Sequence, residues 1–323
     1  MTTDSKAQRR AAWQDYWTRG ALQSSGGAPG YIGAIRDYWL GALAPLPADS
    51  RVLNLGCGNG ALERLFRDVP GPRFVSVDLA EVGPEWVDGL SPQARARFEF
   101  HGGTDMEALP LEAASVDAVV SQYGLEYARP EPAWAEIRRV ARPGARLALL
   151  LHHADSLLAR SAAGEAEQGR YLLQESALLE AAAALVPFLA MAANPAGRER
   201  LGRDPQAARL RERYNEAQAA ARAWQGGQGA GGLLEDVATG VHQSLGAIGR
   251  LGRDAVERHL AVVRERIEHA VLRQRELTAV ALDEAAFAAL CAQVESWGGR
   301  VDRREPLYEG DSLLGWVLEG ALP

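Results

Sequence analysis

The sequence predicts an α/β fold: a Rossmann-like, doubly wound sheet of seven strands, mostly parallel with an antiparallel C-terminal hairpin, and a large α-helical insertion. Three observations predict it. Residues 49–153 alternate short apolar runs with helical patterns, which is the usual signature of βαβ units. Residues 154–280 show helical periodicity and no strand pattern. Residues 300–307 and 313–319 are typical of two strands joined by a turn.

Of the first two regions, only the second is expected to contribute strands to the sheet. Residues 1–48 are expected to be helical and aromatic, and the glycine-rich stretch 20–30 divides this segment in two. The core, residues 49–153, has five expected strands, over 51–55, 73–77, 97–101, 116–121 and 146–151. Helices are expected over 61–67 and 132–140. Such connections cross over right-handed and place helices on both faces of the sheet.

The last two regions are the insertion, 154–280, and the C-terminal segment, 281–323. In the insertion, apolar residues recur at helical spacing over 256–271, and Asp254 and Glu257 are placed as a capping box. The glycine-rich stretch 226–232 is either a flexible joint or a simple loop between helices. Asp283 is expected to cap a helix that ends near Trp297, and the final hairpin completes the core sheet.

Composition narrows the class of protein. The 323-residue chain is 47% hydrophobic with a net charge of −7, which favours a soluble globular protein and argues against nucleic acid as a partner. Two cysteines, Cys57 and Cys291, are too few for a disulfide scaffold. No stretch reaches the roughly 18 apolar residues of a membrane span, and the start lacks a secretory pattern, so a cytoplasmic location is expected. Lys6 is the only lysine, which we interpret as coding bias.

A glycine-rich turn is the strongest functional signal. An apolar strand leads directly into Gly56-Cys57-Gly58-Asn59-Gly60, and a helix follows. The G-x-G-x-G spacing suits an amino-acid tail better than a pyrophosphate, for which G-x-G-x-x-G is typical, and the P-loop pattern is absent. Asp78 ends the next strand, where its carboxylate can accept hydrogen bonds from both hydroxyls of a ribose. Together these features predict a nucleoside-type cofactor.

Four segments in order, VLNLGCGNG, VDLA, GGTDMEALPLEAASVDAVVSQYGLEY and ARPGARLALLLHH, span about 100 residues. Over them the chain resembles the class I S-adenosylmethionine (SAM) dependent methyltransferases, most closely the small-molecule branch similar to ubiquinone and menaquinone biosynthesis enzymes (methyltransferase type 11). The resemblance implies SAM as cofactor and S-adenosylhomocysteine as product. This chain departs from the family pattern at Asn54, where the family usually has Asp or Glu. We therefore expect weaker SAM binding, because a charge facing the SAM ammonium group is lost.

The resemblance also implies a set of cofactor-binding residues. Glycines 56, 58 and 60 would line the methionine end of SAM and Asp78 would bind the ribose. Asp105 would bind the adenine amino group, the backbone N–H of Met106 a ring nitrogen, and Gln122 would lie beside the methionine moiety. Cys57 and Leu79 are expected to contact the cofactor as well. Tyr16 and Trp17 are expected either to close over the sulfonium by cation–π attraction or simply to pack on the sheet.

The chemistry needs few side chains, because the SAM methyl is already electrophilic and alignment can supply most of the rate. Residues at the carboxyl ends of two strands are the candidates for contact with the acceptor. Tyr123, Glu126 and Tyr127 are expected to bind the substrate. His152 and His153 are candidates for a base, although adjacent side chains on a strand point to opposite sides. The pair does not have the spacing of a metal site.

The sequence therefore predicts methyl transfer to an oxygen, or next a nitrogen, of a small organic acceptor, in secondary metabolism. The helical insertion is expected to be a substrate lid, and the alternative, which can coexist with a lid, is a platform for a homodimer. Three other functions stay open: methylation of a peptide or carboxylate in natural-product tailoring, non-catalytic SAM-dependent regulation, and nicotinamide-dependent chemistry. The last fits Asp78 but not the spacing of the glycine loop.

Overall fold

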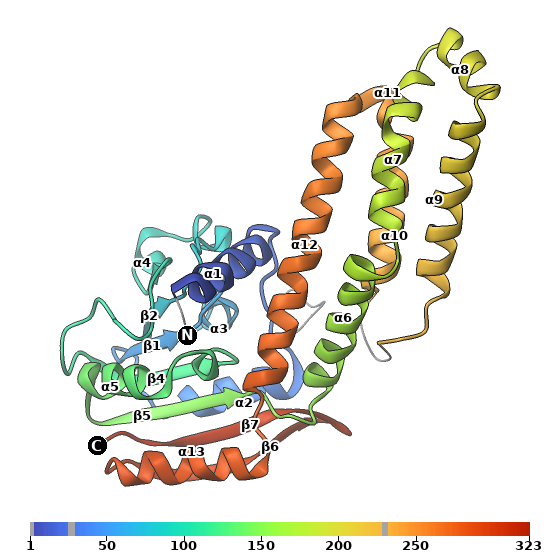
Figure 1. Cartoon of the computed structure of the whole chain (residues 1–323). Coiled ribbons are helices and arrows are strands. Elements are labelled where there is room, and N and C mark those ends of the chain that lie inside the picture. The colour runs from blue at the N-terminus through green and yellow to red at the C-terminus, as the bar shows by residue number, and fades with distance from the viewer. Residues whose placement is uncertain (1–2, 25–29, 228–231) are drawn as a thin grey trace. The chain divides into compact units, whose positions relative to one another are not determined.

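The computed structural model describes residues 3–24, 30–227 and 232–323, and the chain divides into two compact units. Unit 1 contains residues 1–159 and 276–323, and unit 2 contains residues 160–275. Each unit is described by itself (Figure 1). The division into regions 1–48, 49–153, 154–280 and 281–323 stays a prediction.

Unit 1 is built on one mixed sheet of seven strands in the order β3-β2-β1-β4-β5-β7-β6. The strands are β1 (Arg51–Leu55), β2 (Arg73–Val77), β3 (Phe98–His101), β4 (Val116–Gln122), β5 (Ala141–Leu151), β6 (Arg300–Glu309) and β7 (Ser312–Ala321). The first five pair in parallel, whereas β7 runs antiparallel to both β5 and β6. The predicted Rossmann-like sheet with an antiparallel C-terminal hairpin is confirmed.

One strand starts earlier than predicted. β5 begins at Ala141 and not near Arg146, because Ala141 pairs with Val116 before the register shifts and Arg146 pairs with Ala118. Gly144, with φ of 76°, lies in this irregular stretch just after Pro143. The strand pattern fails here because proline and glycine normally mark the end of a strand.

Helices cover both faces of the sheet. On one face, α2 (Gly33–Leu43) and α3 (Ala61–Leu65) bury Trp39, Leu43 and Leu62 against strand residues such as Phe74. On the other face, α5 (Pro130–Val140) and α13 (Glu284–Ser296) bury a second cluster that includes Trp134, Ile137, Phe287 and Val294. Asp283 caps α13 by accepting a hydrogen bond from the Ala286 N–H at 2.8 Å, as predicted. The remaining helices of this unit are α1 (Thr3–Thr18), η1 (Glu85–Val87), α4 (Pro92–Arg95) and η2 (Leu125–Tyr127).

The strand order creates a switch point between β1 and β4, because the chain winds outward from β1 in one direction and from β4 in the other. The loops that follow these two strands come close together there. A Cβ on Gly124 would lie 2.8 Å from the Leu55 carbonyl oxygen and 3.1 Å from the Gly56 Cα. The Ser121 hydroxyl donates to that same Leu55 carbonyl at 2.8 Å. The carboxyl ends of β1 and β4 therefore form one tightly packed platform.

The two edges of the sheet are short or charged. β3, at one edge, has four residues. β6, at the other edge, has mostly exposed or half-buried residues and includes the neighbouring pairs Arg300–Asp302 and Arg303–Glu305, followed by Pro306. These properties contrast with β7, whose residues 315–320 are buried.

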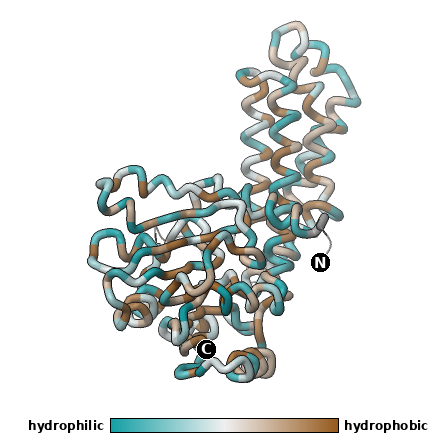
Figure 2. Tube along the Cα trace, turned by 90° about the vertical axis from the view of Figure 1, so that its left-hand side faces the viewer, coloured by the Kyte–Doolittle hydropathy of each residue, from teal (hydrophilic) through white to brown (hydrophobic). Residues whose placement is uncertain are grey.

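All the regular secondary structure in the described residues of unit 2 is helical, as predicted. Its elements are α7 (Leu178–Met191), α8 (Pro195–Gly202), α9 (Pro205–Ala223), α10 (Leu233–Gly246) and α11 (Ile248–Leu251), together with most of α6 (Leu157–Gln174) and α12 (Arg253–Val280). The helices share a core that includes Leu172, Val186, Ala221, Val241 and Ile267. Figure 2 shows hydrophobic and hydrophilic residues alternating along them, the pattern of helices that bury one face.

Two details of this region differ from, or fall outside, the prediction. α12 begins at Arg253, so Asp254 lies within its first turn, and Glu257 pairs with Arg253 at 2.8 Å instead of closing a capping box. Of the glycine-rich stretch 226–232, residues 228–231 lie outside the described residues. No single described helix is long and apolar enough to cross a membrane; by length and composition only, α6 and α7 pass together, with a 45° bend between them.

Candidate active site

The loop after β1 has a shape that depends on glycine. Gly56, Gly58 and Gly60 have φ values of 72°, 51° and 74°, in the left-handed region that other residues avoid. A Cβ on Gly58 would also lie 2.6 Å from the Trp17 ring, and one on Gly60 would lie 2.8 Å from Phe100. The loop ends where Gly60 precedes α3. Its backbone is thus bent at three places within five residues.

Asp78 follows β2 and faces this loop. One carboxylate oxygen accepts a hydrogen bond from the Gly58 N–H at 2.8 Å, and the other accepts one from the Ala80 N–H at 2.9 Å. The residue is only 7% exposed, and burial raises its pKa to about 6 although the two hydrogen bonds oppose the shift. Each oxygen keeps a second lone pair, so the carboxylate can still accept from two hydroxyl groups.

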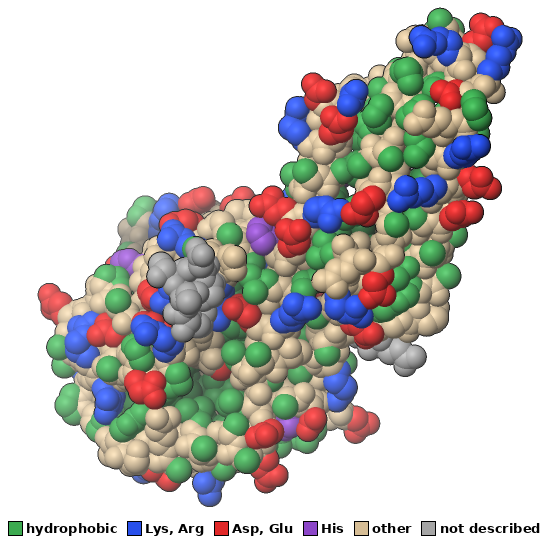
Figure 3. All heavy atoms as spheres, viewed as in Figure 1, with side chains coloured by type: hydrophobic (Ala, Val, Ile, Leu, Met, Phe, Trp, Pro, Cys, Tyr) green, Lys and Arg blue, Asp and Glu red, His purple; other side chains and the backbone are tan. Residues whose placement is uncertain are grey.

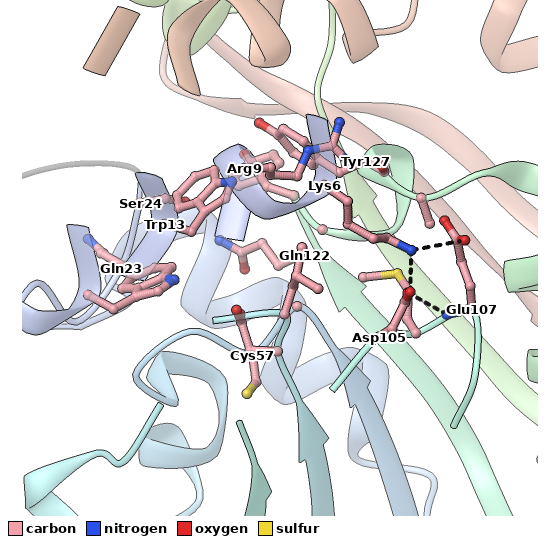
Figure 4. A pocket seen from close by; sticks show the side chains of 18 of the residues that line it. Lys6, Arg9, Trp13, Gln23, Ser24, Cys57, Asp105, Glu107, Gln122 and Tyr127 are labelled. Carbon is pink, nitrogen blue, oxygen red and sulfur yellow. Dashed lines mark hydrogen bonds and ion pairs between the residues drawn. The ribbon is translucent and has the colours of Figure 1, made fainter. Parts of the chain in front are cut away.

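One cavity in unit 1 gathers most of the predicted cofactor residues (Figure 4). Those that line it are Gly56, Cys57, Asp78, Leu79, Asp105, Met106, Gln122 and Trp17. Gly58, Gly60 and Tyr16 are not among its lining residues. Tyr16 instead packs edge-on against Trp17, with ring centroids 4.9 Å apart, and its hydroxyl donates to the Gln23 carbonyl at 3.0 Å. The cavity lies at the switch point of the sheet, where ligands of such folds bind.

Helix α1 contributes three side chains that were not predicted, Lys6, Arg9 and Trp13, beside the predicted Trp17. Lys6, Arg9, Trp13 and Trp17 all line the cavity. Their spacing of three, four and four residues places them on one helix face, which is the signal in the sequence that could have identified them. Arg9 fixes the helix to the core, because it pairs with Glu276 at 2.8 Å and donates to the Tyr127 carbonyl at 2.6 Å.

Lys6 closes one end of the cavity. Its ammonium group pairs with Asp105 and lies 3.2 Å from a Glu107 oxygen, as Figure 4 shows. Burial lowers the pKa of Lys6, but the hydrogen bonds to Asp105 and Glu107 outweigh it, so the net shift is upward. Glu107 also pairs with Arg129 at 2.7 Å. The chain's only lysine, for which no function was predicted, therefore forms an ion pair with the carboxylate that is expected to bind adenine.

The structure brings only two of the three expected substrate residues to this cavity. Tyr123 and Tyr127 line the cavity. Glu126 lines a different groove, beside Trp134 and Leu290, because the tight turn of η2 directs Glu126 and Tyr127 to different sides. One Glu126 oxygen accepts from the His152 N–H at 2.8 Å and the other is buried without a hydrogen-bond partner. Burial raises the pKa of Glu126 to about 7, although backbone hydrogen bonds oppose the shift.

The two histidines after β5 point to opposite sides, as the alternation of a strand predicts. His152 is 2% exposed and stacks on Tyr123 with ring centroids 4.3 Å apart. His153 stacks on Trp316, also at 4.3 Å, and its Nδ1 accepts from the Asp155 N–H at 2.9 Å. Neither is among the described residues that line the cavity. Burial lowers the pKa of His152 to about 3, which makes it a weak base.

The assignment of a base to His152 or His153 stays a prediction with a direct test. We expect His152→Ala and His153→Ala to keep turnover within about tenfold at saturating cofactor, because alignment can supply most of the rate. The measurement is kcat of each variant from pH 5 to 8. A pH-dependent loss of about 100-fold or more in one variant is typical of removing a general base and would identify that histidine as the base.

Comparisons with known proteins agree with this geometry. A family model described as a methyltransferase domain matches residues 53–149, which run from β1 into β5. A malonyl-[acyl-carrier protein] O-methyltransferase of Hahella chejuensis is 35% identical over 98 residues, which cover 30% of this chain and 34% of the relative. An uncharacterized methyltransferase of Mycobacterium tuberculosis is 35% identical over 132 residues, which cover 41% of this chain and 50% of the relative.

Among solved structures, the 1,6-didemethyltoxoflavin-N1-methyltransferase of Burkholderia thailandensis aligns with a TM-score of 0.38 and 24% identity, over 46% of this chain and 63% of that chain. The chain spans about a third to a half of the length of the curated relatives it matches. The residues matched by the family model, 53–149, include the glycine loop, Asp78 and Asp105.

Proposed function

Because residues 53–149 form a class I SAM-dependent methyltransferase domain, we propose that this chain transfers the methyl group of SAM to a small organic acceptor. The observation that carries the proposal is that the glycine loop, Asp78 and Asp105 line one cavity at the switch point of the sheet. S-Adenosylhomocysteine is the second product of such a transfer.

The residues present fit this cofactor. The Asp78 oxygens have lone pairs left for the two ribose hydroxyls, and Asp105 has an oxygen for the adenine amino group once Lys6 withdraws. Gly56 and Cys57 would hold the methionine end. When bound, SAM supplies an electrophilic methyl group on a sulfonium. The chain's own residues then need only orient the acceptor and exclude water.

The aromatic lining of the cavity favours an acceptor with an apolar or aromatic part. Tyr31, Tyr123, Tyr127 and Trp13 are among its lining residues. Their rings give broad contact area, and a charged polymer would not match them. On the face shown in Figure 3, Arg and acidic side chains of the described residues lie interspersed, so that face offers no extended basic area to a nucleic acid. We propose an oxygen, or next a nitrogen, as the methylated atom.

The helical unit follows β5 directly in the chain. We propose that it serves as a lid for the acceptor, with a dimerisation platform as the alternative role. Support comes from its position in the sequence, since insertions at this point of the fold follow a strand whose carboxyl end lies at the site.

A calorimetric titration with SAM, S-adenosylhomocysteine and NAD tests the proposal. We expect SAM and S-adenosylhomocysteine to bind and NAD to give no heat, because the loop lacks the spacing of a pyrophosphate site. An acceptor screen with radiolabelled SAM then tests transfer itself. Binding of NAD alone would overturn the proposal in favour of a nicotinamide-dependent enzyme, and tight SAM binding with no transfer to any small-molecule pool would favour a regulatory protein.

Lys6 provides a more specific prediction. Lys6→Met should bind SAM up to about fivefold more tightly, because a partly exposed ion pair worth about 0–1 kcal/mol no longer competes for Asp105. The dissociation constant from calorimetry measures the effect. Arg10→Met is the matched control, since Arg10 lies on the same helix but pairs with the exposed Glu81. A tenfold weaker affinity in Lys6→Met would mean that Lys6 holds the cofactor instead of competing with it.

A further inference from the structure

A buried carboxylate lies directly beneath the glycine loop. Glu63 is the third residue of α3 and is 0% exposed. One of its oxygens accepts hydrogen bonds from the Asn54 side-chain amide, at 2.8 Å, and from the Ser76 hydroxyl. Asn54 and Ser76 are paired across β1 and β2, so the carboxylate is anchored to both strands that end at the cavity.

The second Glu63 oxygen has no partner. It is buried and makes no hydrogen bond, and among the described residues no cationic side chain lies within ion-pair distance of it. An unpaired buried carboxylate is costly to the fold. Glu63 is not among the residues that line the cavity, so its carboxyl group would act on a ligand there through its charge and not by direct contact.

Glu63 lies next to the position where this chain lacks an acidic residue that the resembled family usually has. The resembled family usually has Asp or Glu where this chain has Asn54, and Asn54 is the residue whose amide binds Glu63. The carboxylate is therefore displaced by nine residues along the chain but remains one hydrogen bond away in space. The end of β1 thus keeps a carboxyl group, supplied from α3; burial raises the pKa of Glu63, and the hydrogen bonds from Ser76 and Asn54 oppose this shift.

The Glu63 charge acts on the cavity wall. Cys57 and Tyr31 both line the cavity. Burial raises the pKa of each, and the Glu63 carboxylate is the next cause of the upward shift in both. A cation placed beside Cys57 would experience the same field with the opposite, favourable sign.

We propose that Glu63 is a positioning residue that holds the ammonium group at the methionine end of SAM by its charge, in place of the carboxylate missing at position 54. This inference rests on the proposed function. In place of the expected weakening of SAM binding by Asn54, the negative charge is then supplied by Glu63.

Glu63→Gln tests the proposal, because it keeps the shape and removes the charge. We expect SAM affinity to fall at least tenfold. Affinity for methylthioadenosine, which has the adenosine and the thioether but no amino-acid part, should stay within twofold. The melting temperature of the ligand-free protein should be unchanged or higher, since a desolvated charge is removed. A carboxylate needed only for folding would instead lower the melting temperature and weaken both ligands equally.

The double variant Asn54→Asp, Glu63→Gln is the matched second test. It restores a carboxylate to the same hydrogen-bonded pair, and we expect SAM affinity to return to within threefold of the unmodified protein. Equal loss for both ligands in Glu63→Gln, or no loss for SAM, would overturn the role of Glu63. If the unmodified protein binds neither SAM nor methylthioadenosine, the proposed function fails as well. This outcome distinguishes failure of the proposed function from failure of the role of Glu63 alone.

Discussion

Replacing Asp78 with alanine is expected to weaken SAM binding by about 2–3 kcal/mol, or about 30- to 150-fold in Kd. The change removes the acceptor for both ribose hydroxyls. It also leaves the N–H groups of Gly58 and Ala80 without their partner, so the loop itself loses a support. Calorimetry or equilibrium dialysis gives the measurement. Asp68→Ala, at an exposed site on the same unit, is the control and should have no effect.

The same carboxylate gives SAM binding a pH dependence. Its pKa of about 6 lies above the ordinary value, so the ionised form that accepts two hydrogen bonds is depleted as pH falls below 6. We expect the Kd for SAM to rise on acidification through this range and to be flat above it. For stability the sign is opposite: a raised carboxyl pKa stabilises the ligand-free fold at low pH, and this contribution is lost as pH rises through 6. An unchanged SAM affinity in Asp78→Ala would contradict the assignment of the ribose.

Gly124→Ala is expected to have the second large effect, on stability and cofactor binding together. Gly124 has φ of −132°, outside the left-handed region that favours glycine, so the main expected effect of alanine is steric. Its Cβ would lie 2.8 Å from the Leu55 carbonyl oxygen and 3.0 Å from the Ser121 hydroxyl, both fixed in the platform that joins β1 to β4. Separating these strand ends should cost about 1–3 kcal/mol of stability and displace Gly56.

Thermal unfolding and SAM titration measure the two consequences of Gly124→Ala. We expect the melting temperature to fall by several degrees and the Kd for SAM to rise at least tenfold. Gly41→Ala is the control, since a Cβ there meets nothing within 4 Å and alanine favours the α2 helix by about 0.5–1 kcal/mol. Normal SAM affinity in Gly124→Ala would show that the contact between the two loops does not shape the cavity.

Local sequence signals predicted the fold well where one element dictates its own structure. β1 and β2 have the predicted bounds because each is an apolar run stopped by glycine or by an acidic residue. The opposite orientation of His152 and His153 follows from strand alternation. The early start of β5 could not be predicted, because its first residues owe their strand geometry to pairing with Val116 and not to their own composition.

The site was predictable only where its motif is local. The glycine loop and Asp78 carry recognisable spacing, whereas Lys6 and Asp105 meet across 99 residues without any sequence pattern that links them. Glu126 was grouped with Tyr123 and Tyr127 by proximity in sequence, and the tight turn of η2 separates it from them. Glu63 gave no signal either, since its meaning depends on its contact with Asn54.

The edges of the sheet carry a consequence for how the protein behaves in concentrated solution. An exposed strand edge can pair with the edge of another molecule and start aggregation. β6 places alternating charges and Pro306 along one edge, and β3 offers only four residues at the other. Both features oppose the addition of a foreign strand. Both edges of the sheet are therefore poor sites for the addition of a strand from another copy of this chain.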